Sequence, residues 1–248
     1  MSERPMFAKR ATGFKTVAVE YTCDDAFPGV GEYVPNQTFS EVILGGPGAG
    51  KSSFMINQLI TRGAYRNTFE SIIYVCPPES KASIRKIPGK YTPECYYYET
   101  LHDNIPEINA IIEDTRVGRK NRNRTLLILD DVQGELKTGE VQAWFIERQI
   151  KRRHHRLSTM ILCQNYIMVP SPVRTNLSCI VLMHTDAQKE LDLISKEFST
   201  FDRKTLGYIC KHNLRDPHDF VILNRTTRAI SCGEAHGATT DFYMLDPV

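Results

Sequence analysis

Short apolar runs alternate with amphipathic stretches from residue 39 to residue 212. The runs are continuous rather than alternating, which is typical of strands that are buried on both faces. The expected strands cover residues 39–45, 71–77, 125–131, 158–164 and 178–183. The expected helices cover residues 51–62, 102–116, 139–153, 186–198 and 202–212. This order predicts an α/β fold in which a mainly parallel sheet carries helices on both of its faces.

The two ends of the chain depart from this alternation. Residues 1–37 are rich in turn-forming Pro and Gly, and we expect them to be an N-terminal extension. Residues 38–248 form the main domain, with a core over 38–185 and C-terminal helices and a hairpin over 186–248. Two apolar runs, 220–224 and 228–231, are joined by three residues and predict that hairpin.

Composition excludes several classes of protein. The chain has 248 residues, of which 41% are hydrophobic and 24% charged, values that exclude a disordered chain, a fibrous repeat and a coiled coil. No window approaches 18 uninterrupted apolar residues, so no transmembrane helix is expected. The seven cysteines are odd in number and contain no CxxC pair, which favours reduced thiols in an intracellular compartment.

Positive charge is concentrated locally although the formal net charge is only +2. Residues 116–124 carry five basic side chains, and residues 148–156 carry five more. These two segments are locally basic regions of a chain that is not basic as a whole.

The strongest local motif is the sequence GGPGAGKS at residues 45–52, which matches the phosphate-loop pattern GxxxxGK[ST] at every fixed position. An apolar strand precedes the motif and a helix follows it, as phosphate binding requires. Glycines let successive backbone N–H groups turn towards an anion, and the helix N-terminus adds further donors. The predicted nucleotide-binding residues are Gly45, Gly46, Pro47, Gly48, Ala49, Gly50, Lys51, Ser52 and Ser53.

Two further polar groups follow buried strands. Asp130 and Asp131 come after four apolar residues, about 80 residues beyond the phosphate loop. Asp130 would join Ser52 in holding Mg²⁺, and Asp131 would polarise an attacking water. A role for Asp131 in capping a helix or supporting a ligand is the alternative. Gln164 ends the strand 158–164, where an amide could sense the γ-phosphate of ATP; a simple strand end is the alternative.

The three motifs, in this order, resemble the additional-strand class of P-loop ATPases. The segment RRHHRLSTMILCQNYIMVPSPVRTN, residues 152–176, narrows the resemblance. Its Gln-Asn-Tyr, Pro and Arg-x-Asn arrangement is similar to genome-packaging ATPases of the FtsK–HerA superfamily, of the kind found in large eukaryotic DNA viruses and virophages. The resemblance covers roughly residues 38–185. The sequence departs from the family pattern at Arg152, where Gly is usual, and at Asp131, where many relatives have Glu.

The resemblance implies an ATPase that packages double-stranded DNA into a capsid, with ATP and Mg²⁺ as ligands. It also implies a homo-oligomeric ring, a pentamer or a hexamer, that contacts capsid proteins. Such a protein would act at the viral assembly site inside the infected host, with retention in the virion as a further expectation. The resemblance gives Lys51, Asp131 and Gln164 catalytic roles, and makes Arg153 the first and Arg174 the second candidate for a trans-acting arginine finger.

The basic segment 116–124 offers DNA-contact candidates. Arg119, Lys120 and Arg122 would bind the phosphate backbone of DNA without reading its sequence, or would form a solvent-exposed turn.

Two other functions stay open from the sequence. A cellular or plasmid DNA pump of the same superfamily is one of them. A P-loop nucleoside or small-molecule kinase is the other, with basic residues between 203 and 215 as a conceivable lid over the phosphates.

Overall fold

The computed structural model describes residues 25–80, 94–117, 123–183, 188–198, 202–234 and 241–245. Most of the expected N-terminal extension lies outside this range. The DNA-contact candidates Arg119, Lys120 and Arg122 also lie outside the described residues.

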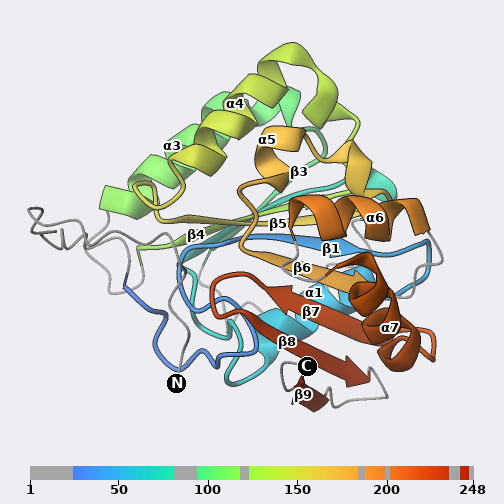
Figure 1. The fold of residues 1–248 in the computed structure, drawn as a ribbon. Coiled ribbons are helices and arrows are strands. Elements are labelled where there is room, and N and C mark those ends of the chain that lie inside the picture. Colours follow the sequence, from blue (N-terminus) through green and yellow to red (C-terminus); the bar gives the residue numbers. More distant parts are fainter. Residues whose placement is uncertain are drawn as a thin grey trace, which may run out of the picture.

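A nine-stranded sheet forms the centre of the molecule, with strand order β3-β2-β4-β5-β1-β6-β7-β8-β9 (Figure 1). Strands β3 to β6 in this order pair in parallel, and β7, β8 and β9 add to the sheet in antiparallel fashion. The strands are β1 (Ser40–Leu44), β2 (Ser71–Val75), β3 (Glu94–Tyr98), β4 (Thr125–Asp130), β5 (Leu157–Cys163), β6 (Cys179–Met183), β7 (Phe220–Asn224), β8 (Ala229–Glu234) and β9 (Asp241–Leu245).

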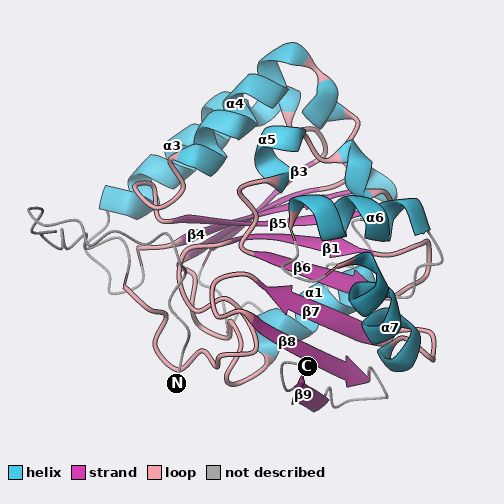
Figure 2. Ribbon diagram, in the orientation of Figure 1, coloured by secondary structure: helices cyan, strands magenta, loops and turns pink. Residues whose placement is uncertain are grey.

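The helices cover the two faces of the sheet unequally (Figure 2). They are α1 (Lys51–Ile60), α3 (Ile105–Val117), α4 (Gly139–Ile150), α5 (Ser171–Arg174), α6 (Gln188–Glu197) and α7 (Arg203–Asn213). Buried apolar residues of α3 to α7 pack in one cluster, whereas α1 packs on the opposite face. The predicted α/β fold and the C-terminal hairpin, β7–β8, are confirmed.

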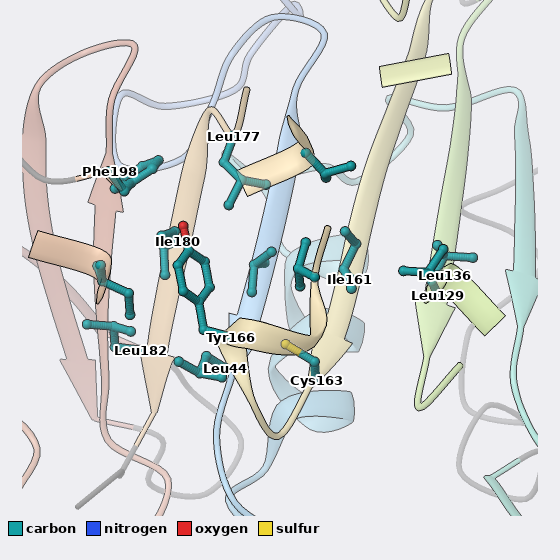
Figure 3. Close-up of a cluster of buried hydrophobic side chains, with 14 of the residues drawn as sticks. Leu44, Leu129, Leu136, Ile161, Cys163, Tyr166, Leu177, Ile180, Leu182 and Phe198 are labelled. Atoms are coloured by element: carbon teal, nitrogen blue, oxygen red, sulfur yellow. The ribbon is translucent and has the colours of Figure 1, made fainter. Parts of the chain in front are cut away.

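Alternate residues of each strand supply the two clusters, because successive side chains of a strand point to opposite faces. Val42 and Leu44 join the cluster under α3 to α7, whereas Ile43 between them joins the cluster under α1. Figure 3 shows part of the first cluster, in which the Tyr166 ring lies among strand residues such as Leu44 and Leu182. Burial on both faces explains why these strands are continuously apolar.

Loops complete the second face of the sheet. Phe27, Phe39, Tyr65 and Phe69 form an aromatic group there, with the Phe39 and Tyr65 rings stacked at a centroid distance of 4.8 Å. Residues 25–39, part of which was expected to be an extension, therefore contribute directly to the core. None of the helices in the described part of the chain is long and apolar enough to cross a membrane.

Two strands and one α-helix of the described residues were not expected. β3 is an edge strand with the sequence ECYYY, and no residue of it is fully buried, so it lacks a continuous apolar run. β9 extends the sheet beyond the predicted hairpin. α5 has only four residues, too few to show helical periodicity.

A carboxyl group is buried in the first strand of the sheet. Glu41 of β1 has no exposed surface, and burial raises its pKa to about 8 although Gln58 of α1 donates a hydrogen bond to it. The donor Nε2 lies 3.1 Å from Glu41 Oε1. The folded protein therefore carries a protonated Glu41 at neutral pH.

Replacing Glu41 by Gln should flatten the dependence of stability on pH. The unfolded chain releases the Glu41 proton near pH 4.5, whereas the folded chain keeps it until about pH 8. The associated stability is therefore complete below pH 4.5 and is lost as the pH rises to about 8. We expect the melting temperature of the wild type to fall between pH 5 and pH 8 by several degrees more than that of Glu41→Gln. Exposed Glu32→Gln is the control, and equal slopes for wild type and Glu41→Gln would contradict the assignment.

Candidate nucleotide-binding site

The phosphate loop, residues 45–52, follows the carboxyl end of β1 and includes the first two residues of α1. Gly48 and Gly50 have φ values of +73° and +93°, a region that residues with a Cβ rarely adopt. Gly45 N donates to Cys163 O at the end of β5, at 3.2 Å, which ties the start of the loop to the neighbouring strand. A Cβ at Gly45 would lie 3.0 Å from Cβ of both Ala49 and Met183, so the loop is closely packed at its base.

Lys51 folds back over the loop. Its Nζ donates to the carbonyl oxygens of Gly45 and Gly46 at 2.9 and 3.1 Å, and the residue is 8% exposed. These carbonyls hold the ammonium group at the concave side of the loop. This arrangement supplies a positive charge where a phosphate group would lie.

Asp130 is the last residue of β4 and is 3% exposed. Its Oδ2 accepts a hydrogen bond from Tyr74 of β2 at 2.5 Å, and Ser52 Oγ lies 3.5 Å away. Burial raises the pKa of Asp130 and the charge of Asp131 raises it further, while the Tyr74 hydroxyl, Lys51 and Ser52 oppose the rise. Burial, followed by the charge of Asp130, also raises the pKa of Tyr74.

Asp131 and Gln164 directly follow their strands and do not belong to them. Asp131 turns out of β4 with a φ of +55°, and its N–H donates to Leu162 O of β5 at 3.3 Å. Gln164 follows Cys163, the last residue of β5, and is exposed. β5, which precedes Gln164, lies between β4 and β1. In the additional-strand class of P-loop ATPases, which the sequence resembles, the strand that ends in Gln has this position.

A cleft of about 710 Å³ brings the predicted groups together. Predicted residues that line it are Pro47, Gly48, Gly50, Lys51, Ser52, Ser53, Asp130, Asp131 and Gln164. Gly45 and Gly46 contribute through the carbonyls that hold Lys51, and Ala49 N donates to Gly46 O within the loop.

Three other cleft residues were not predicted: Ile56, Ser80 and His218. Ile56 lies one turn into α1, and Ser80 ends a short 3-10 helix after β2 (Pro78–Ser80). His218 comes from the turn between α7 and β7. The only sequence signal for it is that the turn formers Asp216 and Pro217 precede a strand.

The residues in the cleft fit a nucleotide with a divalent cation. A hydroxyl and a carboxylate, from Ser52 and Asp130, converge beside the phosphate loop, and oxygen ligands of this kind suit Mg²⁺. Tyr74 leaves the other carboxylate oxygen of Asp130 available. The buried carboxylate would also gain a compensating charge from a bound cation.

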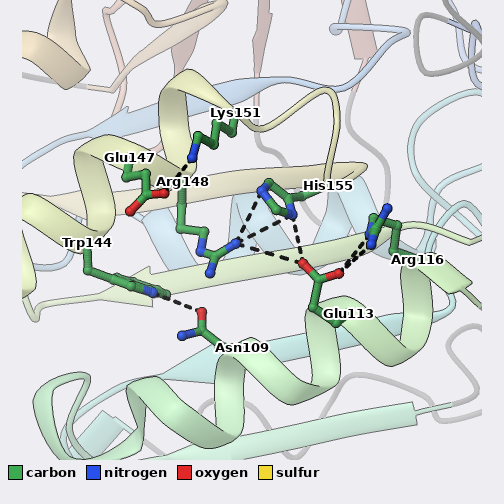
Figure 4. A network of polar contacts seen from close by, with 8 residues as sticks. All are labelled: Asn109, Glu113, Arg116, Trp144, Glu147, Arg148, Lys151 and His155. Carbon is green, nitrogen blue, oxygen red and sulfur yellow. Dashed lines mark hydrogen bonds and ion pairs between the residues drawn. The ribbon is translucent and has the colours of Figure 1, made fainter.

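Arg153 lies in an exposed turn that precedes β5. A polar network between α3 and α4 supports this turn, as Figure 4 shows. Glu113 Oε1 of α3 lies 3.0 Å from the His155 ring and 4.0 Å from Arg148, and Glu113 Oε2 pairs with Arg116 at 2.7 Å. The His155 ring also contacts Arg148 at 3.2 Å.

Backbone hydrogen bonds also fix the turn that carries Arg153. Leu157 N donates to Arg152 O, and Arg156 N donates to Arg153 O, with Arg156 at a φ of +49°. Because the turn precedes β5 and Gln164 follows it, Arg153 lies at the edge of the sheet opposite the cleft. The seven residues of β5 separate the two edges by roughly 20 Å.

The structure does not bring Arg174 to the cleft either. Arg174 is 8% exposed, and its guanidinium pairs with both carboxylate oxygens of Glu197 at 2.7 and 3.0 Å. It also donates to the carbonyls of Ile167 and Val169 and lies over the Tyr166 ring. These contacts give Arg174 a structural role at the end of α5, because its hydrogen bonds are directed into its own subunit.

Comparison with known proteins gives a family for the chain. The family model described as "Poxvirus A32 protein" matches residues 32–212. The match spans the phosphate loop, both acidic residues, Gln164 and both candidate arginines. No curated protein matches the chain.

Solved structures of two viral packaging proteins and of a bacterial protein, EssC, have the same fold. The DNA-packaging ATPase B204 of Sulfolobus turreted icosahedral virus is 18% identical, with a TM-score of 0.57 over 78% of this chain and 96% of that one. The genome-packaging NTPase B204 of Sulfolobus turreted icosahedral virus 2, in complex with ATP-gammaS, is 18% identical, with a TM-score of 0.54 over 79% and 96%. EssC (ATPases 2 and 3) from Geobacillus thermodenitrificans is 14% identical, with a TM-score of 0.55 over 83% and 39%.

Replacing Tyr74 by Phe should weaken Mg²⁺ binding while leaving the fold intact. The Tyr74 hydroxyl orients Asp130, and loss of a group that orients a metal ligand commonly costs about tenfold or more in metal affinity. We expect the Mg²⁺ concentration for half-maximal nucleotide binding to rise about tenfold. Tyr97→Phe on neighbouring β3 is the matched control, since its ring lies 6.3 Å from that of Tyr74. An unchanged Mg²⁺ requirement in Tyr74→Phe would refute this role.

Proposed function

We propose that this chain, which belongs to the poxvirus A32 protein family, is an ATP-hydrolysing motor that drives double-stranded viral DNA into a capsid. The observation that carries the proposal is the convergence of Lys51, Ser52, Asp130, Asp131 and Gln164 on one cleft. Phosphate-loop and acidic groups bind a nucleotide, and Gln164 at the same cleft suits hydrolysis by water. Solved structures with this fold include a genome-packaging NTPase and a DNA-packaging ATPase, which supports the proposal.

The phosphate loop would bind the triphosphate through its backbone N–H groups and the N-terminus of α1. Lys51 would exchange its contacts with Gly45 and Gly46 for contacts with the β- and γ-phosphates. Ser52 and Asp130 would hold Mg²⁺. The bound cation would neutralise charge that develops on the phosphates during transfer.

Asp131 and Gln164 would act on the attacking water. Both are exposed to the cleft and directly follow adjacent strands, so they can contact one small molecule between them. Asp131 would accept a hydrogen bond or a proton from the water, and the Gln164 amide would hold the water in line with the γ-phosphate. The left-handed turn at Asp131 directs its short side chain out of the sheet and into the cleft.

An arginine for the γ-phosphate would come from another subunit. Arg153 is exposed and held in a supported turn, but it lies across the sheet from its own cleft. It can therefore act only on a neighbour, in a ring where the amino edge of one sheet faces the cleft of the next subunit. Arg174 is a weaker candidate because Glu197 already engages its guanidinium.

The proposal includes the remaining partners. The motor would form a homo-oligomeric ring, a pentamer or a hexamer, around double-stranded DNA and would dock on capsid proteins. It would act at the viral assembly site in infected cells and could be retained in the virion. A cellular DNA pump of the same superfamily is less well supported, because the family that matches is a poxvirus family.

The kinase alternative gains no support from the structure. Arg203, at the start of the conceivable lid, pairs with Asp192 of α6. Among the described residues, no arginine or lysine between 203 and 215 lines the cleft.

Mixing two inactive variants tests the shared site. Lys51→Ala removes the charge that binds phosphate and should abolish ATP hydrolysis. Arg153→Ala should lower it about 10³-fold with little change in the melting temperature, because Arg153 is exposed. A mixture of the two should regain activity, because an intact cleft can meet an intact Arg153 across a subunit boundary. The measurement is ATPase rate against protein concentration, with and without double-stranded DNA.

Arg174→Ala is the comparison for this experiment. Breaking its buried pair with Glu197 should lower stability by about 3 kcal/mol, so loss of activity should be accompanied by a lower melting temperature. Full ATPase activity in Lys51→Ala would refute the proposed function. A mixture that stays inactive would remove Arg153 as a trans-acting group.

Charge reversal of Arg119, Lys120 and Arg122 tests the DNA contacts. A translocase that binds backbone phosphates should lose affinity steeply with salt and show little preference for sequence. The triple variant to Glu should bind DNA more weakly, with a shallower slope of log affinity against log salt. Reversal of Lys204 and Lys211 on α7 is the control. Unchanged affinity in the triple variant would exclude residues 119–122 from DNA binding.

A further inference from the structure

His218 lines the nucleotide cleft, yet the hydrolysis mechanism above gives it no role. It belongs to the turn between α7 and β7 and is exposed. A Cβ built on Gly50 would lie 2.8 Å from His218 Nδ1, so the imidazole lies directly against the phosphate loop. The contact brings together two segments that are 168 positions apart in the sequence.

The turn that carries His218 is fixed by its neighbour Asp219, which is 3% exposed. Asp219 Oδ2 accepts hydrogen bonds from Arg215 N and Asp216 N, at 3.0 and 2.7 Å. Asp219 N donates to Asp216 O at 3.1 Å. These bonds close the turn on both sides of Pro217 and hold the imidazole in place over Gly50.

The backbone of His218 is strained. Its φ is +83°, in a region that residues with side chains rarely adopt. Such conformations persist only where the surrounding structure imposes them, and they cluster at ligand sites. The bonds to Asp219 supply that constraint, and the strained residue is the one that faces the cleft.

The strand order shows which part of a nucleotide would reach His218. Asp130, Asp131 and Gln164 follow β4 and β5, which lie on one side of β1 and define the γ-phosphate end of the cleft. β6 and β7 lie on the other side of β1, and His218 stands two residues before Phe220, the first residue of β7. A triphosphate that crosses the loop with its γ-phosphate towards β4 and β5 therefore directs its nucleoside towards β7.

We propose that His218 is a specificity-determining residue that binds the nucleoside of the bound triphosphate through its imidazole ring. The inference rests on the proposed function, because it assumes a nucleoside triphosphate in this cleft. The ring packs against the nucleoside and selects a nucleotide over a bare polyphosphate. Gly50 leaves the space for the ring, since a side chain there would collide with Nδ1.

Comparison of a nucleotide with a bare triphosphate isolates this contact. The full-length protein is titrated with the Mg²⁺ complexes of a non-hydrolysable ATP analogue and of inorganic tripolyphosphate. His218→Ala should bind the ATP analogue roughly tenfold more weakly, as expected when a ring that stacks on a base is removed. Its affinity for tripolyphosphate should not change. His218→Phe, which keeps a flat ring, should retain most of the affinity for the analogue.

Two further variants exclude a general loss of structure. His218→Asn tolerates a positive φ, so it should keep the wild-type melting temperature and still lose affinity for the analogue. His212→Ala is the matched control, because this exposed histidine of α7 packs against Tyr208 with the two rings tilted by 45° and does not line the cleft. It should bind both ligands as the wild type does.

The outcomes separate this inference from the proposed function. Lys51→Ala should weaken binding of both ligands, and its failure to do so would refute the phosphate site itself. If His218→Ala weakens both ligands equally, the imidazole acts on the phosphates and the inference is wrong. It is also wrong if His218→Ala binds both ligands as tightly as the wild type.

Discussion

Parallel pairing of β4, β5 and β1 is the constraint on which the site depends. In this arrangement three carboxyl ends meet at one edge, which places Asp130, Gln164 and the phosphate loop side by side. The bonds from Gly45 N to Cys163 O and from Asp131 N to Leu162 O continue the pairing just beyond the strands. A shift of one residue in the register of β4 would turn the side chain of Asp130 to the opposite face of the sheet. The strand register therefore determines the arrangement of the functional groups as well as the packing of the core.

Two buried clusters stabilise that register. Each central strand contributes apolar side chains to both of them, so a strand that slides would disrupt the packing of both clusters. Two buried acidic residues on the central strands have hydrogen-bond partners. Glu41 is protonated and bonded to Gln58, and Asp130 is bonded to Tyr74 at the carboxyl edge. The second of these lies beside the cleft, where a bound cation would balance its charge.

The sequence predicts the parts of the fold that depend on continuous burial. The central strands, the phosphate loop and the acidic pair follow from apolar runs and from glycine spacing, which are local signals. β3 is not predicted because it is an edge strand, and an edge strand needs no continuous apolar run. Its tyrosines remain partly exposed. The place of His218 in the cleft is not predicted, because His218 contacts Gly50 only in the folded chain. The burial of Arg174 is missed for the same reason, since its partner Glu197 lies 23 positions away on α6.

The segment from Gln164 to Arg174 links the two edges of the sheet. Glu190 of α6 accepts hydrogen bonds from Tyr166 N at 2.9 and 3.0 Å, two residues after Gln164. Arg174 lies over the Tyr166 ring and bonds the carbonyls of Ile167 and Val169, and Glu197 at the end of α6 holds Arg174 in turn. Glu190 and Glu197 of α6 bind the two ends of the segment, so the segment and the helix form one packed unit. This packed unit therefore extends from Gln164, at the cleft, to Arg174 at the end of α5. In the proposed ring, the amino edge of the sheet, where Arg153 precedes β5, would face the cleft of the next subunit.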